Sequence, residues 1–241
     1  MGTSISQPKR QTTSHKSELQ EEISVLNAQL KVDQIMFVDL MFVNSIPYLI
    51  SVFKPLESVS VSKLTKKDII SIYKIVISHV NSIRKHGMKI TMLRVDGESA
   101  INTDWFTSKI NAEGIILDTT GAGEAVTVVE RKIRQIKERF RGISNTLPYK
   151  LTESLEFWLV KYVVSRIVLV PTKNSVEYVS PREKLWGRRI NVDKEVKHGY
   201  GDYVEVHSNV VNNSMYERTS GAIALMPSGN LEGSWYFYLL H

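Results

Sequence analysis

The sequence contains no cysteine and no long apolar run, and each absence excludes a class of protein. Without cysteine the chain forms neither a disulfide nor a thiolate metal site, and its six histidines are too scattered to indicate a zinc site. No apolar run reaches the roughly 20 residues that a membrane-spanning helix needs, and the N-terminus lacks the apolar segment of a signal peptide. We therefore expect a soluble, intracellular protein without a membrane partner, in which oxygen atoms hold any metal ion.

The positive charge of the chain is concentrated in its middle. The 241 residues carry a net charge of +6, and 42% of them are hydrophobic, which is ordinary for a globular protein. Residues 126–198 hold 16 Lys and Arg against 8 acids, whereas residues 1–125 hold 14 against 13 and residues 199–241 hold 1 against 4. Because cations that neutralise phosphates release condensed counterions, this excess indicates a nucleic-acid partner. The alternative interpretation is a solubilising surface.

The spacing of apolar residues predicts three strands, then a helix, a strand, a helix, a strand and a long helix. In chain order, the expected elements are a β-hairpin over residues 34–53, a strand over 58–64, a helix over 69–83, a strand over 89–95, a helix over 100–111, a strand over 114–117, and helices over 124–143 and 151–169. In the helix over 124–143 the apolar residues recur at alternating intervals of three and four, as a helix buried along one stripe requires.

Composition divides the chain into four parts. Residues 1–30 form a polar tail and a short lead-in helix, and residues 31–170 hold the core. Residues 171–198 read as a basic linker, irregular after Pro181. Residues 199–241 contain three β-rich segments separated by Asn, Ser, Pro and Gly, which predicts a small antiparallel module. The sequence ends soon after the last segment, so a truncated module is one interpretation.

Three carboxylates lie in or next to different predicted elements, among apolar residues. Asp39 lies within a predicted strand, Asp96 just past the end of another, and Glu130 early in the long helix. A buried, unpaired carboxylate is costly, so acids among apolar neighbours are usually paired, protonated or bound to a metal. For any one of them the alternative is an outward-facing residue or a helix cap. Together they predict a site for two Mg²⁺ or Mn²⁺ ions, which prefer oxygen ligands and support phosphoryl transfer.

Basic residues follow Glu130 on the same helix. Arg134, Lys137 and Arg141 stand four, seven and eleven positions after it, so they lie on the same side of the helix as the acid. The alternative interpretation is a solvated face with ordinary ion pairs. Beside a metal site, these side chains would bind a DNA backbone through its phosphates without reading its sequence.

Three stretches resemble the integrase core of retroviruses and long-terminal-repeat retrotransposons, and most of all that of copia-type polyproteins. They are DLMFVNSIPYLISV, LRVDGESAI and GAGEAVTVVERKIRQIKERFRG followed by LP, and the resemblance covers about residues 33–210. It implies a ribonuclease-H-like fold, with a mixed five-stranded sheet flanked by helices as the catalytic core over residues 31–170. The later stretches SPREKLWGRR and GYGDYVEV are similar to the region that follows the core in retrotransposon polyproteins.

The same resemblance implies roles for individual residues. That family uses two aspartates and a glutamate, the second aspartate and the glutamate about 35 positions apart, and here Asp96 and Glu130 are 34 apart. Asp39 takes the place of the first aspartate. Asp33 also precedes an apolar run, but the following MFVNSIPYL favours Asp39. Arg134 and Lys137 match the positions with which the family contacts DNA.

The resemblance implies DNA integration by metal-dependent 3′-end processing and strand transfer, with element ends and target duplex as substrates. It also implies a homo-oligomer that works in the nucleus. The family's N-terminal His/His/Cys/Cys zinc module cannot form in a chain without cysteine, so residues 1–30 are not that module. Two alternatives stay open: an inactive or domesticated relic that only binds nucleic acid, and a ribonuclease-H-like nuclease acting on hybrids or junctions.

Overall fold

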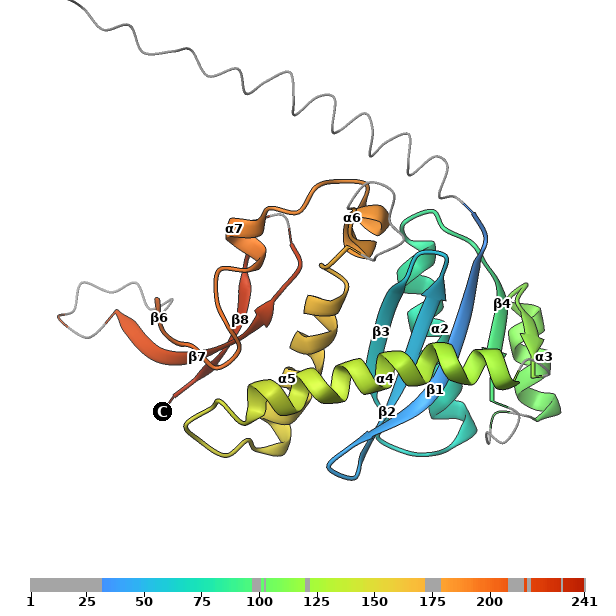
Figure 1. Cartoon of the computed structure of the whole chain (residues 1–241), viewed down its shortest axis with the longest axis horizontal. Coiled ribbons are helices and arrows are strands. Elements are labelled where there is room, and N and C mark those ends of the chain that lie inside the picture. Colours follow the sequence, from blue (N-terminus) through green and yellow to red (C-terminus); the bar gives the residue numbers. More distant parts are fainter. Residues whose placement is uncertain are drawn as a thin grey trace, which may run out of the picture.

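The computed structural model describes residues 32–96, 101, 103–119, 122–171, 179–207, 215, 218–230 and 232–240. The tail and lead-in helix expected over residues 1–30 lie outside the described residues. The described chain forms two sheets, with helices packed on the larger one (Figure 1). No helix in these described ranges is both long and apolar enough to cross a membrane.

The larger sheet has five strands in the order β3-β2-β1-β4-β5. The strands are β1 (Gln34–Val43), β2 (Ile46–Lys54), β3 (Ser58–Lys63), β4 (Ile90–Val95) and β5 (Ile116–Asp118). Strands β1, β2 and β3 pair antiparallel, while β4 pairs parallel with β1 and β5 parallel with β4. Asn44 and Ser45 make the tight turn between β1 and β2, and both have positive φ angles, of 47° and 68°, as the turns of two-residue hairpins require.

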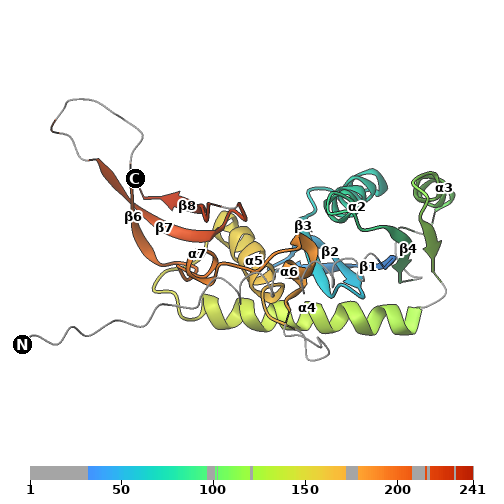
Figure 2. The same cartoon turned by 90° about the horizontal axis from the view of Figure 1, so that it is seen from above.

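Helices cover both faces of this sheet (Figure 2). The helices are α2 (Ile69–Arg84), α3 (Asp104–Ala112), α4 (Ala122–Ser144) and α5 (Glu153–Ile167). Apolar residues of α2 and α3 form one buried cluster with one face of the sheet, and those of α4 and α5 form a second cluster with the other face. Successive residues of a strand point to opposite faces, so Phe37 packs under α4 while its neighbours Met36 and Val38 pack under α2.

The mixed five-stranded sheet flanked by helices confirms the predicted ribonuclease-H-like fold. The expected helix over 100–111 begins later, at Asp104, because the hydroxyl of Thr103 accepts the N–H of Phe106 and caps the helix there. The order of the elements is as predicted, and their ends differ by a few residues.

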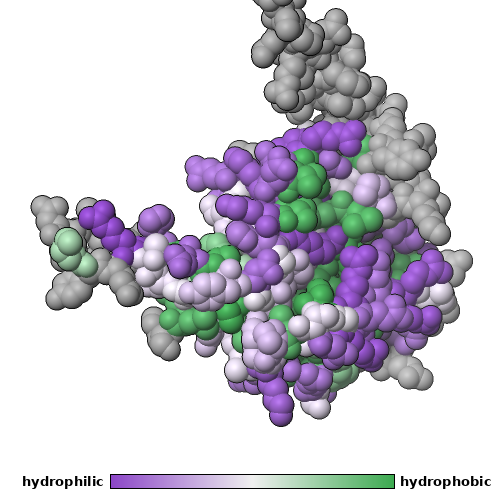
Figure 3. Space-filling view, turned by 60° about the vertical axis from the view of Figure 1, so that its left-hand side comes forward, coloured by the Kyte–Doolittle hydropathy of each residue, from purple (hydrophilic) through white to green (hydrophobic). Residues whose placement is uncertain are grey.

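The predicted β-rich module forms a separate antiparallel sheet in the order β6-β7-β8. Its strands are β6 (Tyr203–His207), β7 (Thr219–Pro227) and β8 (Trp235–Leu239). The module packs on α5: the rings of Trp158 and Tyr236 have centroids 5.1 Å apart, and the Tyr200 hydroxyl donates to the Leu155 carbonyl at 2.6 Å. Viewed with the module's side brought forward, the surface shows apolar patches between hydrophilic areas (Figure 3).

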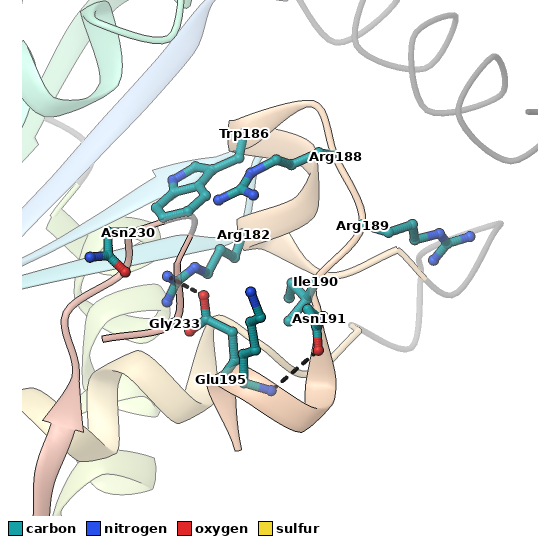
Figure 4. A pocket seen from close by; sticks show the side chains of 10 residues that line it. Arg182, Trp186, Arg188, Arg189, Ile190, Asn191, Glu195, Asn230 and Gly233 are labelled. Carbon is teal, nitrogen blue, oxygen red and sulfur yellow. Dashed lines mark hydrogen bonds and ion pairs between the residues drawn. The ribbon is translucent and has the colours of Figure 1, made fainter. Parts of the chain in front are cut away.

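Residues 181–198 contain two short helices, α6 (Pro181–Trp186) and α7 (Val192–Glu195), so the expected irregular structure is wrong for this stretch. Ser180 and Glu183 form a reciprocal capping box at the start of α6. The guanidinium of Arg182 pairs with the carboxylate of Glu195 at 3.0 Å, and both side chains are buried (Figure 4). The basic composition of this stretch had indicated a linker. The internal ion pair neutralises the charge of Arg182 and allows it to pack in the interior. The division of the chain into four parts stays a prediction.

The buried Arg182–Glu195 pair should be important for stability. Replacing Glu195→Gln leaves a buried guanidinium without its counter-charge, and we expect a loss of roughly 3 kcal/mol in the free energy of unfolding. Glu153→Gln is the matched control, because Glu153 is exposed beside Lys63 and such a pair contributes at most about 1 kcal/mol. Urea unfolding of both variants measures the free energy of unfolding. Equal losses in the two variants would contradict a packed segment over residues 181–198.

Candidate functional site

Asp39 and Asp96 lie side by side on the face of the sheet that α4 covers. Strand alternation places Asp39 on the same side as Met41, which packs in the cluster beneath α4. Strands β1 and β4 run parallel, and Val38 is paired with Val95. The acid that follows each valine, Asp39 or Asp96, therefore stands at the same level of the two neighbouring strands. Both acids are half-buried. This register brings together two acids that are 57 positions apart in the sequence.

Glu130 reaches the same region from the helix above. Helix α4 contacts β1, β2 and β4, and Glu130 is exposed beside the buried Val129. Burial raises the pKa of the Asp39 carboxyl above its ordinary value, and the negative charges of Asp96 and Glu130 raise it further. The N–H of Leu40 donates to Asp39 Oδ1 at 2.6 Å and acts in the opposite direction, lowering the pKa. The negative charges of Asp96 and Glu130 therefore act on the carboxyl of Asp39.

Asp33, the competing first aspartate, is not part of this group. It is exposed and lies just before β1. Six residues of extended chain separate it from Asp39, a distance of about 20 Å. The pairing of Val38 with Val95 places Asp39, and not Asp33, beside Asp96.

The basic residues of α4 line the side that carries Glu130. Arg134 and Arg141 are exposed and Lys137 is half-buried, while Ile136 and Phe140 of the same helix are buried against the sheet. None of the three cations forms an ion pair within the described part of the chain. Their charges are thus available to an anionic partner. Whether these residues bind DNA stays a prediction.

An ion pair beside Asp96 was not found by sequence reasoning. Arg94 Nε donates to Asp118 Oδ2 at 2.9 Å, because β4 and β5 place these residues opposite each other. The Arg94 guanidinium also lies over the Phe37 ring, 5.8 Å from its centroid. Strand alternation puts Arg94 on the same face as Asp96, two residues later. Arg94 and Asp96 are two positions apart at the end of one strand, and Asp118 lies in the next strand. This spacing is the sequence signal that could have revealed a fixed cation next to the carboxylates.

The three acids offer suitable donors for a divalent ion, although they do not form a closed ligand set. Within the described residues, no three His, Asp or Glu side chains are grouped closely enough to hold a metal ion. Carboxylate oxygens are nonetheless the ligands that Mg²⁺ and Mn²⁺ prefer, and Glu130 is an exposed side chain with several rotatable bonds. The donor chemistry therefore fits, provided that Glu130 moves toward the two aspartates.

No protein-family model matches this sequence, and no curated protein matches it. Among solved structures, the chain is similar to the catalytic core domain of BIV integrase, with 12% identity and a TM-score of 0.48 over 62% of this chain and 91% of that one. It is also similar to the HTLV-2 integrase catalytic core domain in complex with magnesium in a trimeric form, with 15% identity and a TM-score of 0.46 over 64% and 95%. At these values the similarity assigns no activity or partner to this chain.

Removing the charge of Asp39 should stabilise the fold. At neutral pH we expect Asp39→Asn to raise the melting temperature by about 2–4 °C, the shift for roughly 1 kcal/mol in a domain of this size, because a partly buried charge repelled by two acids is lost. The gain should fade as pH falls through the raised pKa of Asp39 and vanish below the ordinary value, where the wild-type carboxyl is also neutral. Thermal unfolding in EDTA measures this.

Asp33→Asn is the matched control for this prediction, because Asp33 is exposed on the same chain segment and faces neither acid. We expect it to leave the melting temperature unchanged across the same pH range. A lower melting temperature for Asp39→Asn at neutral pH would contradict the electrostatic reading of the site.

Proposed function

We propose that this chain is a retrotransposon-type integrase core, which joins the 3′ ends of DNA to a target duplex by metal-dependent polynucleotidyl transfer. One observation carries the proposal: Asp39 and Asp96 follow paired residues of two adjacent parallel strands, and helix α4, which carries Glu130, packs on the same face of the sheet. Like charges held together in this way repel one another unless a cation joins them. Such an arrangement is typical of a metal-dependent site rather than of a structural one.

Asp39, Asp96 and Glu130 are the residues that would hold two Mg²⁺ or Mn²⁺ ions. When bound, such ions activate the attacking oxygen and stabilise the leaving oxygen in an in-line displacement at phosphorus. The Leu40 N–H that donates to Asp39 Oδ1 fixes the orientation of that carboxylate. Asp118, a fourth acid nearby, is paired with Arg94 and is therefore not counted among the carboxylates that would hold the ions. The chain itself thus supplies an oriented carboxylate at Asp39, two further carboxylates at Asp96 and Glu130, and a nearby fixed cation.

Arg134, Lys137 and Arg141 would position the DNA. They extend along α4 from Glu130 over eleven residues, a length of about 16 Å. Contacts from such side chains to phosphates fix the register of a duplex without reading its bases. A backbone bound along this side of α4 lies next to the carboxylates, so positioning and chemistry share one helix. Joining two donor ends to one target requires more than one chain, so the proposal includes a homo-oligomer that acts in the nucleus.

A nucleic-acid-binding relic without catalysis is the second candidate. The observation that favours it is the open arrangement of the acids, since the described residues contain no group of three that is close enough to hold a metal ion. Such a protein would keep the basic side of α4 and its DNA contacts. It would not respond to Mg²⁺ or Mn²⁺, and this difference separates the two candidates.

A strand-transfer assay tests the proposal directly. The wild-type chain is mixed with labelled duplex DNA and Mg²⁺ or Mn²⁺, beside Glu130→Gln and the matched control Glu138→Gln, an exposed acid of the same helix. We expect joined products from the wild type and the control, and at least about 100-fold less from Glu130→Gln, because loss of a ligand exceeds the 10–100-fold cost of losing a supporting contact.

Three other outcomes have distinct meanings. DNA binding without any product, together with a melting temperature that does not rise with Mn²⁺, would overturn the enzyme and favour the relic. Cleavage of RNA–DNA hybrids without strand transfer would replace the integrase by a ribonuclease-H-like nuclease. Equal activity of Glu130→Gln and Glu138→Gln would remove Glu130 from the proposed site.

A further inference from the structure

A groove of about 430 Å³ opens at the β3 edge of the large sheet, two strands away from the strand that carries Asp39. Strand β3 and helices α2 and α5 form one wall, and α6 and the end of β7 form the other. Seven serines line it, together with Lys161, Arg182 and two histidines. Among the described residues that line the groove there is no acid. A hydroxyl-rich surface with cations and no carboxylate suits an anionic ligand.

Three of these serines stand in a row on β3. Ser58, Ser60 and Ser62 alternate with Val59 and Val61, which are buried in the cluster under α4 and α5. The serines therefore share the opposite face of the strand, at intervals of about 6.7 Å. No hydrogen bond in the described part of the chain uses the Ser60 hydroxyl. Ser58 is buried, so Ser60 and Ser62 are the β3 serines that are partly exposed at the groove. Hydroxyls at this interval suit a ligand with repeating acceptors.

His79 holds the third serine in place and remains uncharged. Its Nε2 lies 2.9 Å from the Ser62 hydroxyl and its Nδ1 lies 2.8 Å from the Ser51 hydroxyl, so both ring nitrogens are used. Burial lowers the pKa of His79 to about 4, and the nearby charge of Lys161 contributes to the shift. Near neutral pH the histidine therefore orients a hydroxyl. The unpaired positive charge of the groove comes from Lys161, because Arg182 is already paired with Glu195.

Lys161 brings a cation into the groove without a counter-charge. Its Nζ donates to the Val61 carbonyl at 3.2 Å, and no acid in the described part of the chain pairs with it. Burial lowers the pKa of this ammonium. A partly buried charge that lacks a partner is unfavourable, so an anion bound beside it would gain a strong, charge-assisted contact.

At the far end of the groove, the guanidinium groups of Arg182 and Arg188 and the ring of His86 lie beside Trp186. Arg182 lies over the Trp186 ring, 4.3 Å from its centroid, and its Nε has no hydrogen-bond partner in the described chain (Figure 4). The rings of His86 and Trp186 are nearly parallel, with centroids 6.3 Å apart and planes at 11°. Aromatic rings and guanidinium planes are the groups on which nucleobases stack.

We propose that this groove binds a single nucleic-acid strand, with phosphates at Lys161 and the β3 serines and a base near Trp186. It is a second binding site, separate from the basic side of α4, and the choice of nucleic acid rests on the proposed function. A single strand presents phosphates at regular intervals, which suits the β3 serines and the unpaired charge of Lys161.

The absence of cysteine makes a site-specific cross-link practical. Ser60→Cys introduces the one thiol of the chain, and a single-stranded oligonucleotide carries a thiol-reactive group tethered to an internal phosphate. The reaction is run in EDTA so that no metal-dependent step contributes. We expect Ser60→Cys to cross-link at least several-fold more than the matched control Ser108→Cys, an exposed serine of α3, and unmodified strand to suppress the reaction. Equal cross-linking of both variants, or no suppression, would overturn the proposal.

Binding measurements test the role of Lys161. In fluorescence anisotropy with labelled single-stranded DNA, Lys161→Met should weaken binding several-fold and reduce the log–log salt slope by about 0.7, the value for one lost phosphate contact on a single strand. The control Lys109→Met, at an exposed position of α3, should change neither quantity. An unchanged slope in Lys161→Met would contradict a phosphate at this position.

The two proposals fail separately. If Arg134→Ala weakens duplex binding and strand transfer occurs while Ser60→Cys stays unlinked, the groove proposal is wrong and the integrase proposal stands. If Ser60→Cys cross-links and no strand transfer is found, the groove stands as a single-strand site and the integrase proposal is wrong.

Discussion

The parallel pairing of β1 with β4 beneath α4 is the constraint on which the site depends. It sets Asp39 and Asp96 at one level of adjacent strands, and the packing of Val129 and Ile136 on the sheet brings Glu130 over them. Nothing local attracts these acids to one another, since like charges repel. The pairing of β1 with β4 holds the two aspartates, and the apolar cluster that binds α4 to the sheet holds Glu130 over them, so stability of the core and geometry of the site depend on the same contacts.

Some charged side chains form internal ion pairs, whereas other cations have no acidic partner in the described chain. Arg182 and Glu195 pair inside a segment whose composition indicated a solvated linker, and Arg94 pairs with Asp118 inside the sheet. The cations of α4 and Lys161 have no such partner in the described chain. Cations without an ion pair therefore lie on two surfaces of the described chain, one on the side of α4 that carries Glu130 and one along the β3 edge.

The order of elements followed from the sequence because its signals are local, whereas the mixed five-stranded sheet was expected from the resemblance to integrase cores. Apolar spacing of three and four defines α4, and Asn44 and Ser45 mark the hairpin turn. The Arg94–Asp118 pair and the packing of residues 181–195 did not follow, because each depends on residues brought together by tertiary structure. The start of α3 was also missed, since Thr103 acts as a cap only once its hydroxyl meets a backbone N–H.

The central claim is that Asp39, Asp96 and Glu130 share one electrostatic environment. An NMR titration of the Asp39 carboxyl carbon, in the wild type and in Asp96→Asn and Glu130→Gln, measures this most directly. The account predicts a wild-type pKa above the ordinary 3.8 that falls in each variant, because a neighbouring negative charge is removed. A pKa that stays the same in both variants would contradict it.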